Sequence, residues 1–198
     1  MIEKISAQIA TNITDYRELE RIQYLKMKLG LETLLINLSK GVIVYGVAVI
    51  SGIFTLTLIT HLTYSILRRS SGGLHAKSSF VCTMVSITMF VVIPYFLQRV
   101  AIPFSLLMLF FVFCMICISK YAPADTENHP LIGVERREQL RRRSIKTCFV
   151  LMTIAVIIPF HMIRTLIVAG IVMQIVMILP ITYKMLKRSC NNYEKYEV

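Results

Sequence analysis

Long apolar stretches without any acidic residue constrain this chain more than any other feature. Residues 33–124 contain no Asp or Glu, and neither do residues 139–193. In the whole sequence 56% of residues are hydrophobic and only 17% are charged, whereas soluble domains carry about 25% charged residues. Apolar windows separated by short basic clusters are typical of helical membrane proteins. We therefore expect an all-α, polytopic membrane protein.

The apolar windows predict about six membrane segments, since one crossing helix needs about 20 residues. The apolar region over residues 29–67 is too long for one span, and we divide it near Ser51-Gly52. Its first half carries Glu32 and Lys40, which are costly in a bilayer unless they are paired. The expected segments cover residues 29–51, 53–67, 80–97, 103–119, 147–163 and 165–183.

The remaining sequence predicts a simple domain organisation. Isoleucine and leucine recur at helical spacing among charges in residues 1–28, which indicates an N-terminal amphipathic segment. A membrane-embedded domain is expected over residues 29–188, with a polar loop over 120–146, and a cytoplasmic tail over 189–198.

Positive charge predicts the orientation in the cell membrane. Lys and Arg concentrate in residues 68–79, in residues 120–146 and after residue 183, while the other short loops keep only Arg99 and Arg164. The positive-inside rule places the three richer clusters in the cytoplasm, together with both termini. A net charge of +11 favours acidic peptides and anionic lipids as partners, and we expect no nucleic-acid partner.

One short segment combines residues suited to nucleophilic chemistry. Gly72-Gly73-Leu74-His75 lies between two apolar windows, and Cys82 follows seven residues after the histidine. On a continuous helix these two side chains would stand roughly 10 Å apart along the axis, but glycines allow the chain to fold back. A neighbouring histidine and cationic side chains favour the reactive thiolate. The nearby cations are Arg68, Arg69 and Lys77.

The other cysteines and histidines favour structural roles. Cys114 and Cys117 form a Cys-x-x-Cys pair, but it lies wholly inside an apolar window, where packing is the simpler explanation. His61 and His161 also lie in apolar segments, and we interpret them as packed side chains. No zinc-protease motif, nucleophile elbow or phosphate-binding loop occurs. We expect no metal and no cofactor.

Three segments together resemble the accessory gene regulator B (AgrB) family, membrane cysteine endopeptidases of Gram-positive quorum sensing. The first is Arg-Arg-Ser-Ser-Gly-Gly-Leu-His at residues 68–75, followed by Cys82. The second is Lys-Tyr-Ala-Pro-Ala-Asp-Thr-Glu-Asn-His-Pro at residues 120–130, before a basic stretch. The third runs from Gly170 through Gln174 to Leu-Pro-Ile at residues 179–181. Order and spacing match the family over about residues 30–188, with one departure at His129, where the family usually has lysine.

The resemblance implies that His75 and Cys82 are the catalytic pair. It also implies a short AgrD-like propeptide as substrate, with an amphipathic leader, a central cysteine or serine and an acidic tail, and it implies a homodimer. Cleavage would leave an acyl-thioester on Cys82, which closes to a cyclic thiolactone or lactone. Gly72 and Gly73 would form the loop, with their backbone N–H groups as candidate oxyanion donors. Candidate substrate-binding residues are Arg68, Arg69, Lys77, Arg141, Arg142, Arg143 and Gln174.

Several alternatives remain open at this stage. The arginines at 141–143 fit either contact with anionic lipids or capture of an acidic peptide. Ser78, Ser79 and Gln174 are all candidates for a third residue that orients the pair. A non-enzymatic transporter or peptide exporter would make His75 and Cys82 incidental. A lipid-modifying enzyme is a further alternative, although the acidic metal ligands that such chemistry commonly uses do not occur in the spans.

Overall fold

The computed structural model describes residues 2–17, 20–74, 78–127 and 130–197. These residues are mostly helical, with no strands in the described part, so the expected all-α class is confirmed. The chain divides into two compact units, residues 1–47 and residues 48–198. His75, Lys77 and His129 lie outside the described residues.

The first unit contains α1 (Ile2–Arg17) and most of α2 (Arg21–Ile50). Glu32, the costly carboxylate of the first apolar segment, is paired there. Its Oε1 accepts a hydrogen bond from Ser6 Oγ at 3.3 Å and lies 3.6 Å from Lys28 Nζ. The pairing lowers the cost of a charge on an otherwise apolar helix.

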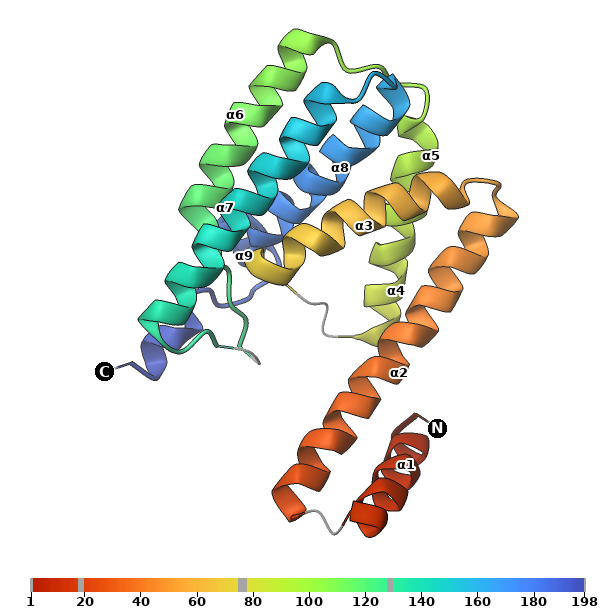
Figure 1. The fold of residues 1–198 in the computed structure, drawn as a ribbon, viewed down its shortest axis with the longest axis vertical. Coiled ribbons are helices and arrows are strands. Elements are labelled where there is room, and N and C mark those ends of the chain that lie inside the picture. The colour runs from red at the N-terminus through yellow and green to blue at the C-terminus, as the bar shows by residue number, and fades with distance from the viewer. Residues whose placement is uncertain (1, 18–19, 75–77, 128–129, 198) are drawn as a thin grey trace. The chain divides into compact units, whose positions relative to one another are not determined.

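The second unit is a bundle of packed helices (Figure 1). The helix α3 (Phe54–Ser71) packs against α7 (Val134–Ile157) and most extensively against α8 (His161–Ile178). The helix α6 (Phe104–Tyr121) packs against both α7 and α8. The remaining elements are α4 (Ser79–Ile87), a π-helical turn (Thr88–Val92), α5 (Ile93–Leu97), α9 (Pro180–Met185) and a 3₁₀ turn (Asn192–Lys195).

Gly170 brings α3 and α8 together. A Cβ atom at this position would lie 2.8 Å from the backbone oxygen of Thr60 and 2.9 Å from Cβ of Thr63. No side chain larger than hydrogen fits between the two backbones. This close approach fixes the position of the C-terminal end of α8 beside the end of α3, where the candidate site lies.

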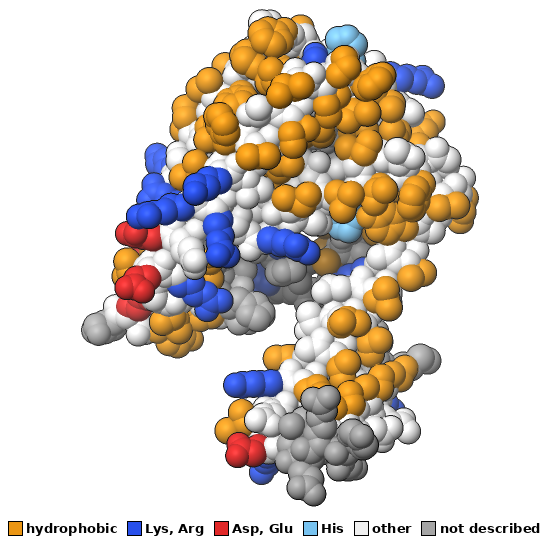
Figure 2. Space-filling view, viewed as in Figure 1, with side chains coloured by type: hydrophobic (Ala, Val, Ile, Leu, Met, Phe, Trp, Pro, Cys, Tyr) orange, Lys and Arg blue, Asp and Glu red, His pale blue; other side chains and the backbone are white. Residues whose placement is uncertain are grey.

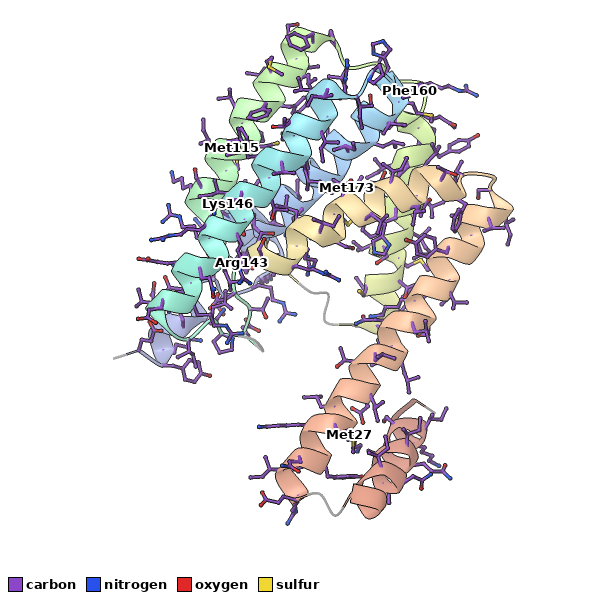
Figure 3. All side chains as sticks on the ribbon, viewed as in Figure 1. Met27, Met115, Arg143, Lys146, Phe160 and Met173 are labelled. Carbon is purple, nitrogen blue, oxygen red and sulfur yellow. The ribbon has the colours of Figure 1, made fainter. Side chains whose placement is uncertain are left out.

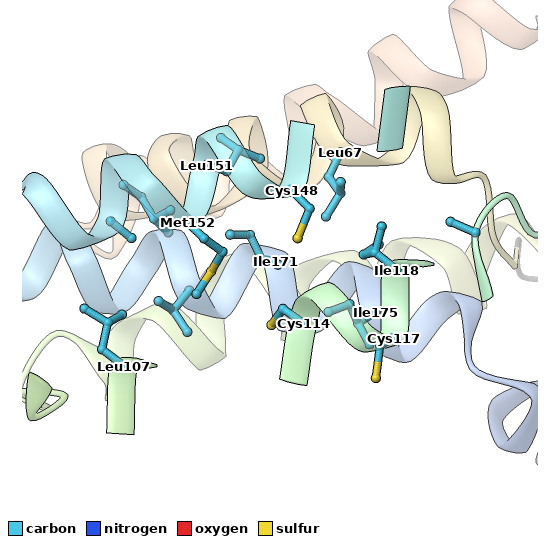
Figure 4. Packing of buried hydrophobic residues seen from close by; sticks show 14 of the residues in the cluster. Leu67, Leu107, Cys114, Cys117, Ile118, Cys148, Leu151, Met152, Ile171 and Ile175 are labelled. Atoms are coloured by element: carbon cyan, nitrogen blue, oxygen red, sulfur yellow. The ribbon is translucent and has the colours of Figure 1, made fainter. Parts of the chain in front are cut away.

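The core of the second unit is apolar and contains three cysteines (Figure 4). Cys114 and Cys117 of α6 and Cys148 of α7 are buried among aliphatic side chains of α3, α7 and α8. The predicted packing role of the Cys-x-x-Cys pair is confirmed. No group of three or more His, Cys, Asp or Glu suited to a metal occurs among the described residues.

Within the part of the chain that the structure describes, four helical stretches are long and apolar enough to cross a membrane: Arg21–Ile50, Ser79–Leu97, Phe104–Tyr121 and His161–Ile178. Large apolar side chains cover much of the surface of the second unit in Figure 2, as lipid-facing helices require. The helices α3 and α7 occupy the other two predicted segments but fall below this criterion. Six crossings therefore stay a prediction.

Two local predictions were wrong. Residues 134–146 belong to the first half of α7, not to a loop. Its Arg, Glu, Gln and Leu residues are good helix formers, and Glu138 pairs with Arg142 one turn later at 3.5 Å. The last predicted segment also breaks at Leu179, because Pro180 has no N–H with which to continue the helical hydrogen bonds.

Candidate active site

The turn after α3 has the backbone geometry that its two glycines suggested. Gly72 has φ +67° and Gly73 has φ +116°, both in the region that side-chain-bearing residues avoid. A Cβ atom at Gly72 would stand 2.2 Å from the backbone oxygen of Ala124, and one at Gly73 would stand 3.0 Å from that of Met177. Glycine is therefore required at Gly72 for its torsion angles and for space.

Backbone hydrogen bonds hold this turn between two distant segments. The Gly73 N–H donates to Ala124 O at 3.0 Å, and the Ala124 N–H donates to Ser71 O at 2.9 Å. The Leu74 N–H donates to Met177 O at 3.1 Å, at the end of α8. The turn is thus fixed on one side by the loop after α6 and on the other side by α8.

Two polar side chains, the buried Gln174 and the half-buried Arg68, add further hydrogen bonds to the turn over residues 71–74, which we call the clamped turn. Gln174 is fully buried, and its Nε2 donates to Ser71 Oγ at 2.8 Å and to Gly72 O at 2.7 Å. Arg68 donates to Leu74 O at 2.6 Å, to Gly73 O at 3.3 Å and to Gln174 Oε1 at 3.4 Å. Both side chains were predicted to bind substrate, and that role stays a prediction. We assign them to holding the turn.

Three segments that are far apart in sequence therefore meet at one place. They are the end of α3 with its glycine turn, the Tyr121–Asp125 loop with its cis Ala122–Pro123 bond, and the stretch from Gln174 to Ile178. The start of α8 lies elsewhere, because Thr165 Oγ1 donates to Val100 O at 2.9 Å. The loops that carry the predicted cytoplasmic charges gather at the opposite end of α8.

Cys82 lies in the first turns of α4, which begins at Ser79, a short distance along the chain from the clamped turn. Its N–H donates to Ser78 O at 3.0 Å, and its side chain is half-buried. On α3, the Tyr64 hydroxyl accepts a 2.6 Å hydrogen bond from Arg68.

The predicted oxyanion donors are not available. The Gly72 N–H donates to Arg68 O, and the Gly73 and Leu74 N–H groups are bonded as described above. Each of these donors is already satisfied within the chain, so none of them can stabilise a developing oxyanion without breaking the turn. That expectation was wrong.

The arginines at 141–143 do not all line the same site. Arg141 Nη2 donates to Ser119 O at 2.6 Å, at the end of α6. Arg142 pairs with Glu138, and both Arg142 and Arg143 line a depression with Lys146. Arg143 and Lys146 are labelled on α7 in Figure 3. Arg69 is exposed. Of these arginines, Arg141 alone points toward the loop that contacts the glycine turn, and it lines a cavity with residues 120–125.

Comparison with known proteins shows the family of this chain. The family model described as "Accessory gene regulator B" matches residues 2–178. A putative AgrB-like protein of Listeria innocua is 45% identical over 174 residues, covering 88% of this chain and 85% of that protein. The accessory gene regulator protein B of Staphylococcus epidermidis is 34% identical, covering 92% of this chain and 93% of that protein. The chain belongs to the accessory gene regulator B family.

A putative AgrB-like protein of Clostridium acetobutylicum extends the similarity to the tail of this AgrB-family chain. It is 35% identical over 197 residues, covering 100% of this chain and 94% of that protein. The family model itself ends at residue 178, before α9 and the tail. No solved structure matches the chain.

The tail of this AgrB-family chain is anchored on the Tyr121–Asp125 loop through a residue that the sequence did not single out. Asp125 is buried, and its carboxylate accepts the Tyr193 N–H at 3.0 Å and Asn192 Nδ2 at 3.4 Å. Its backbone oxygen accepts the Tyr183 hydroxyl at 2.7 Å. Burial and the neighbouring Asp125 charge raise the pKa of Tyr183, which keeps that hydroxyl a donor.

A second such residue is Arg137, on the first turn of α7. Its guanidinium donates from Nη1 and Nη2 to the Glu197 carboxylate, and it lies 4.0 Å from the centre of the Tyr193 ring. Figure 2 shows Lys and Arg side chains gathered beside acidic ones in this region of the second unit. Neither contact has a local sequence signal, because the partners lie far apart along the chain.

Proposed function

We propose that this chain is a membrane cysteine endopeptidase that processes a short AgrD-like propeptide of the quorum-sensing system. Family membership supports a role in the accessory gene regulator system. The observation that carries the proposal is the clamped glycine turn that leads into the helix with Cys82. Of the five cysteines, Cys114, Cys117 and Cys148 are buried in the core and Cys190 lies in the tail.

The proposed reaction has two acyl transfers. His75 takes the proton from Cys82, the thiolate attacks the scissile carbonyl carbon, and the C–N bond breaks. The departing amine of the acidic tail takes the proton back, and an acyl-thioester remains on Cys82. His75 then takes the proton from the central thiol or hydroxyl of the peptide, and the sulfur or oxygen attacks the thioester carbon. The Cys82 thiolate leaves and accepts that proton from His75, and a thiolactone or lactone is closed.

We propose that the clamped turn helps to position the catalytic residues for this reaction. A turn held by Arg68, Gln174 and Ala124 fixes one end of the segment that contains His75, while α4 fixes the other. Ordered elements on both sides of this segment would help to bring a base to the nucleophile. For the oxyanion we propose the first-turn N–H groups of α4, which have no acceptor inside the helix. The Ser78 side chain makes no capping bond to them.

We further propose that this site lies at the cytoplasmic face of the cell membrane. The loops that gather around it carry the basic clusters that the positive-inside rule assigns to the cytoplasm. Anionic lipids and a second copy of the chain stay predicted partners.

Co-expression with the propeptide tests the proposal. We expect Cys82→Ala and His75→Ala each to abolish appearance of the shortened cyclic peptide in mass spectra, at unchanged membrane levels. Cys190→Ala, which removes the exposed tail thiol, is the matched control and should retain processing. Cyclic peptide from the Cys82→Ala protein would refute the endopeptidase and favour a transporter or exporter.

A further inference from the structure

The start of α7 holds a complete carboxylate-binding arrangement. The Gly133 N–H donates to Glu197 Oε1 at 2.6 Å, Arg137 Nη1 donates to the same oxygen at 2.6 Å, and Arg137 Nη2 donates to Oε2 at 2.7 Å. The fork-to-fork geometry is the strongest pairing that a guanidinium makes with a carboxylate. It occurs where the helix dipole also favours negative charge.

The guanidinium of Arg137 is held in place by contacts other than Glu197. Nη1 also donates to Leu131 O at 2.9 Å, and the Tyr193 ring lies against its face. A single side chain, Glu197, therefore occupies a site whose donors are fixed by residues around it. Both partners remain partly exposed, at 18% for Arg137 and 27% for Glu197, so an outside carboxylate can reach the site.

A cavity of about 480 Å³ opens beside this site. Lys120, Arg137 and Arg141 supply basic side chains to its wall, and Asp125 and Glu138 also line it. Residues 121–124 also line it, and within that stretch the backbone oxygen of Ala124 accepts the Gly73 N–H of the clamped turn. The carboxylate site and the candidate active site are thus joined by one short loop.

We propose that the Gly133 amide and Arg137 bind an acidic side chain of the substrate's tail, and that Glu197 occupies this site as an internal competitor. This inference rests on the proposed function, since it assigns the tail-binding site of that reaction. The positive charge of the site indicates its ligand, because a carboxylate of an acidic peptide can take the place of the Glu197 carboxylate. The rest of the tail stays anchored through Asp125 and Glu127 during the exchange.

Binding to an inactive full-length protein tests the exchange. The probe is a rhodamine-labelled synthetic peptide ending in Glu-Asp-Glu, and a Gln-Asn-Gln version is its uncharged match. Anisotropy is measured with Cys82→Ala protein in an uncharged detergent. We expect Arg137→Gln to weaken binding of the acidic probe roughly tenfold, the loss of a charge-assisted pair. Arg136→Gln, an exposed neighbour with the same charge change, should cause a much smaller loss.

The competitor is tested by the reciprocal change. Glu197→Gln should tighten binding of the acidic probe several-fold, because the internal carboxylate no longer competes. Glu194→Gln removes the same charge from an exposed tail position and should have little effect. The proposal is overturned if Arg137→Gln matches Arg136→Gln, or if Glu197→Gln matches Glu194→Gln. If Arg137→Gln fails to fold, the comparison of Glu197→Gln with Glu194→Gln still tests the proposal. Because no variant here needs catalysis, these outcomes are independent of whether Cys82 is a nucleophile.

Discussion

Arg68 and Arg137 each lie in a basic cluster of the sequence, but they donate hydrogen bonds to acceptors of different charge. Arg68 lies at the end of α3 and donates to uncharged acceptors, namely two backbone oxygens, a phenol and an amide. Arg137 lies at the start of α7 and binds a carboxylate. The first arginine organises the turn beside the candidate nucleophile, whereas the second presents an exchangeable site for negative charge.

The difference follows from what surrounds each guanidinium. Helix ends and turns leave backbone oxygens without partners, and a half-buried arginine satisfies several of them at once. An arginine near a helix N-terminus instead faces N–H groups, so an anion is the complementary ligand. Positive charge alone therefore does not identify a substrate contact in this chain.

The largest effect is expected at Gly72, where the turn has no space for a side chain. Gly72→Ala should abolish peptide processing and lower the thermal unfolding temperature in detergent, because its Cβ would overlap Ala124 O. Gly52 is a matched control, since it has φ +70° but an added Cβ there would meet nothing within 4 Å. Gly52→Ala should cost only the torsional strain of about 1–2 kcal/mol. Equal effects of the two substitutions would show that steric contact with the loop after α6 is unimportant.

A smaller effect should separate the two arginines kinetically. Arg68→Lys keeps the charge but cannot reach all four acceptors, so kcat should fall about tenfold with KM unchanged, whatever the charge of the peptide tail. Arg137→Gln should instead raise KM, and only for acidic tails. Steady-state cleavage of the acidic and the amide peptides measures both. If Arg68→Lys raised KM for acidic tails alone, Arg68 would be a substrate contact after all.

The smallest effect concerns pH. Hydrogen bonds from Arg137 and Gly133 lower the pKa of Glu197, and those from Ser189 lower the pKa of Glu127, both relative to an ordinary 4.5. Carboxylates with lowered pKa contribute to tail docking above the ordinary value and lose that contribution as pH falls through the lowered one. Hydrogen exchange of residues 186–197, corrected for intrinsic rates, should therefore increase at acid pH. Exchange of residues 68–74, where Arg68 has uncharged acceptors, should not follow it.

The sequence predicted the helical class, the break at Gly72-Gly73 and the packing of Cys114 and Cys117, because these depend on local pattern and composition. It did not predict that α7 begins at Val134, since polar helix formers lack the apolar signal used to find segments. The internal role of Arg68 depends on acceptors supplied by Gln174. The Arg137–Glu197 pair likewise depends on tertiary contacts with no local pattern.

Intact-protein mass spectrometry after rapid acid quenching tests the nucleophile most directly. Wild-type protein mixed with its propeptide should show an added mass equal to the peptide without its acidic tail. Digestion should place that mass on Cys82, and hydroxylamine should remove it as expected for a thioester. An adduct on Cys190, or cyclic peptide formed with no adduct on any cysteine at any quench time, would contradict the role assigned to Cys82.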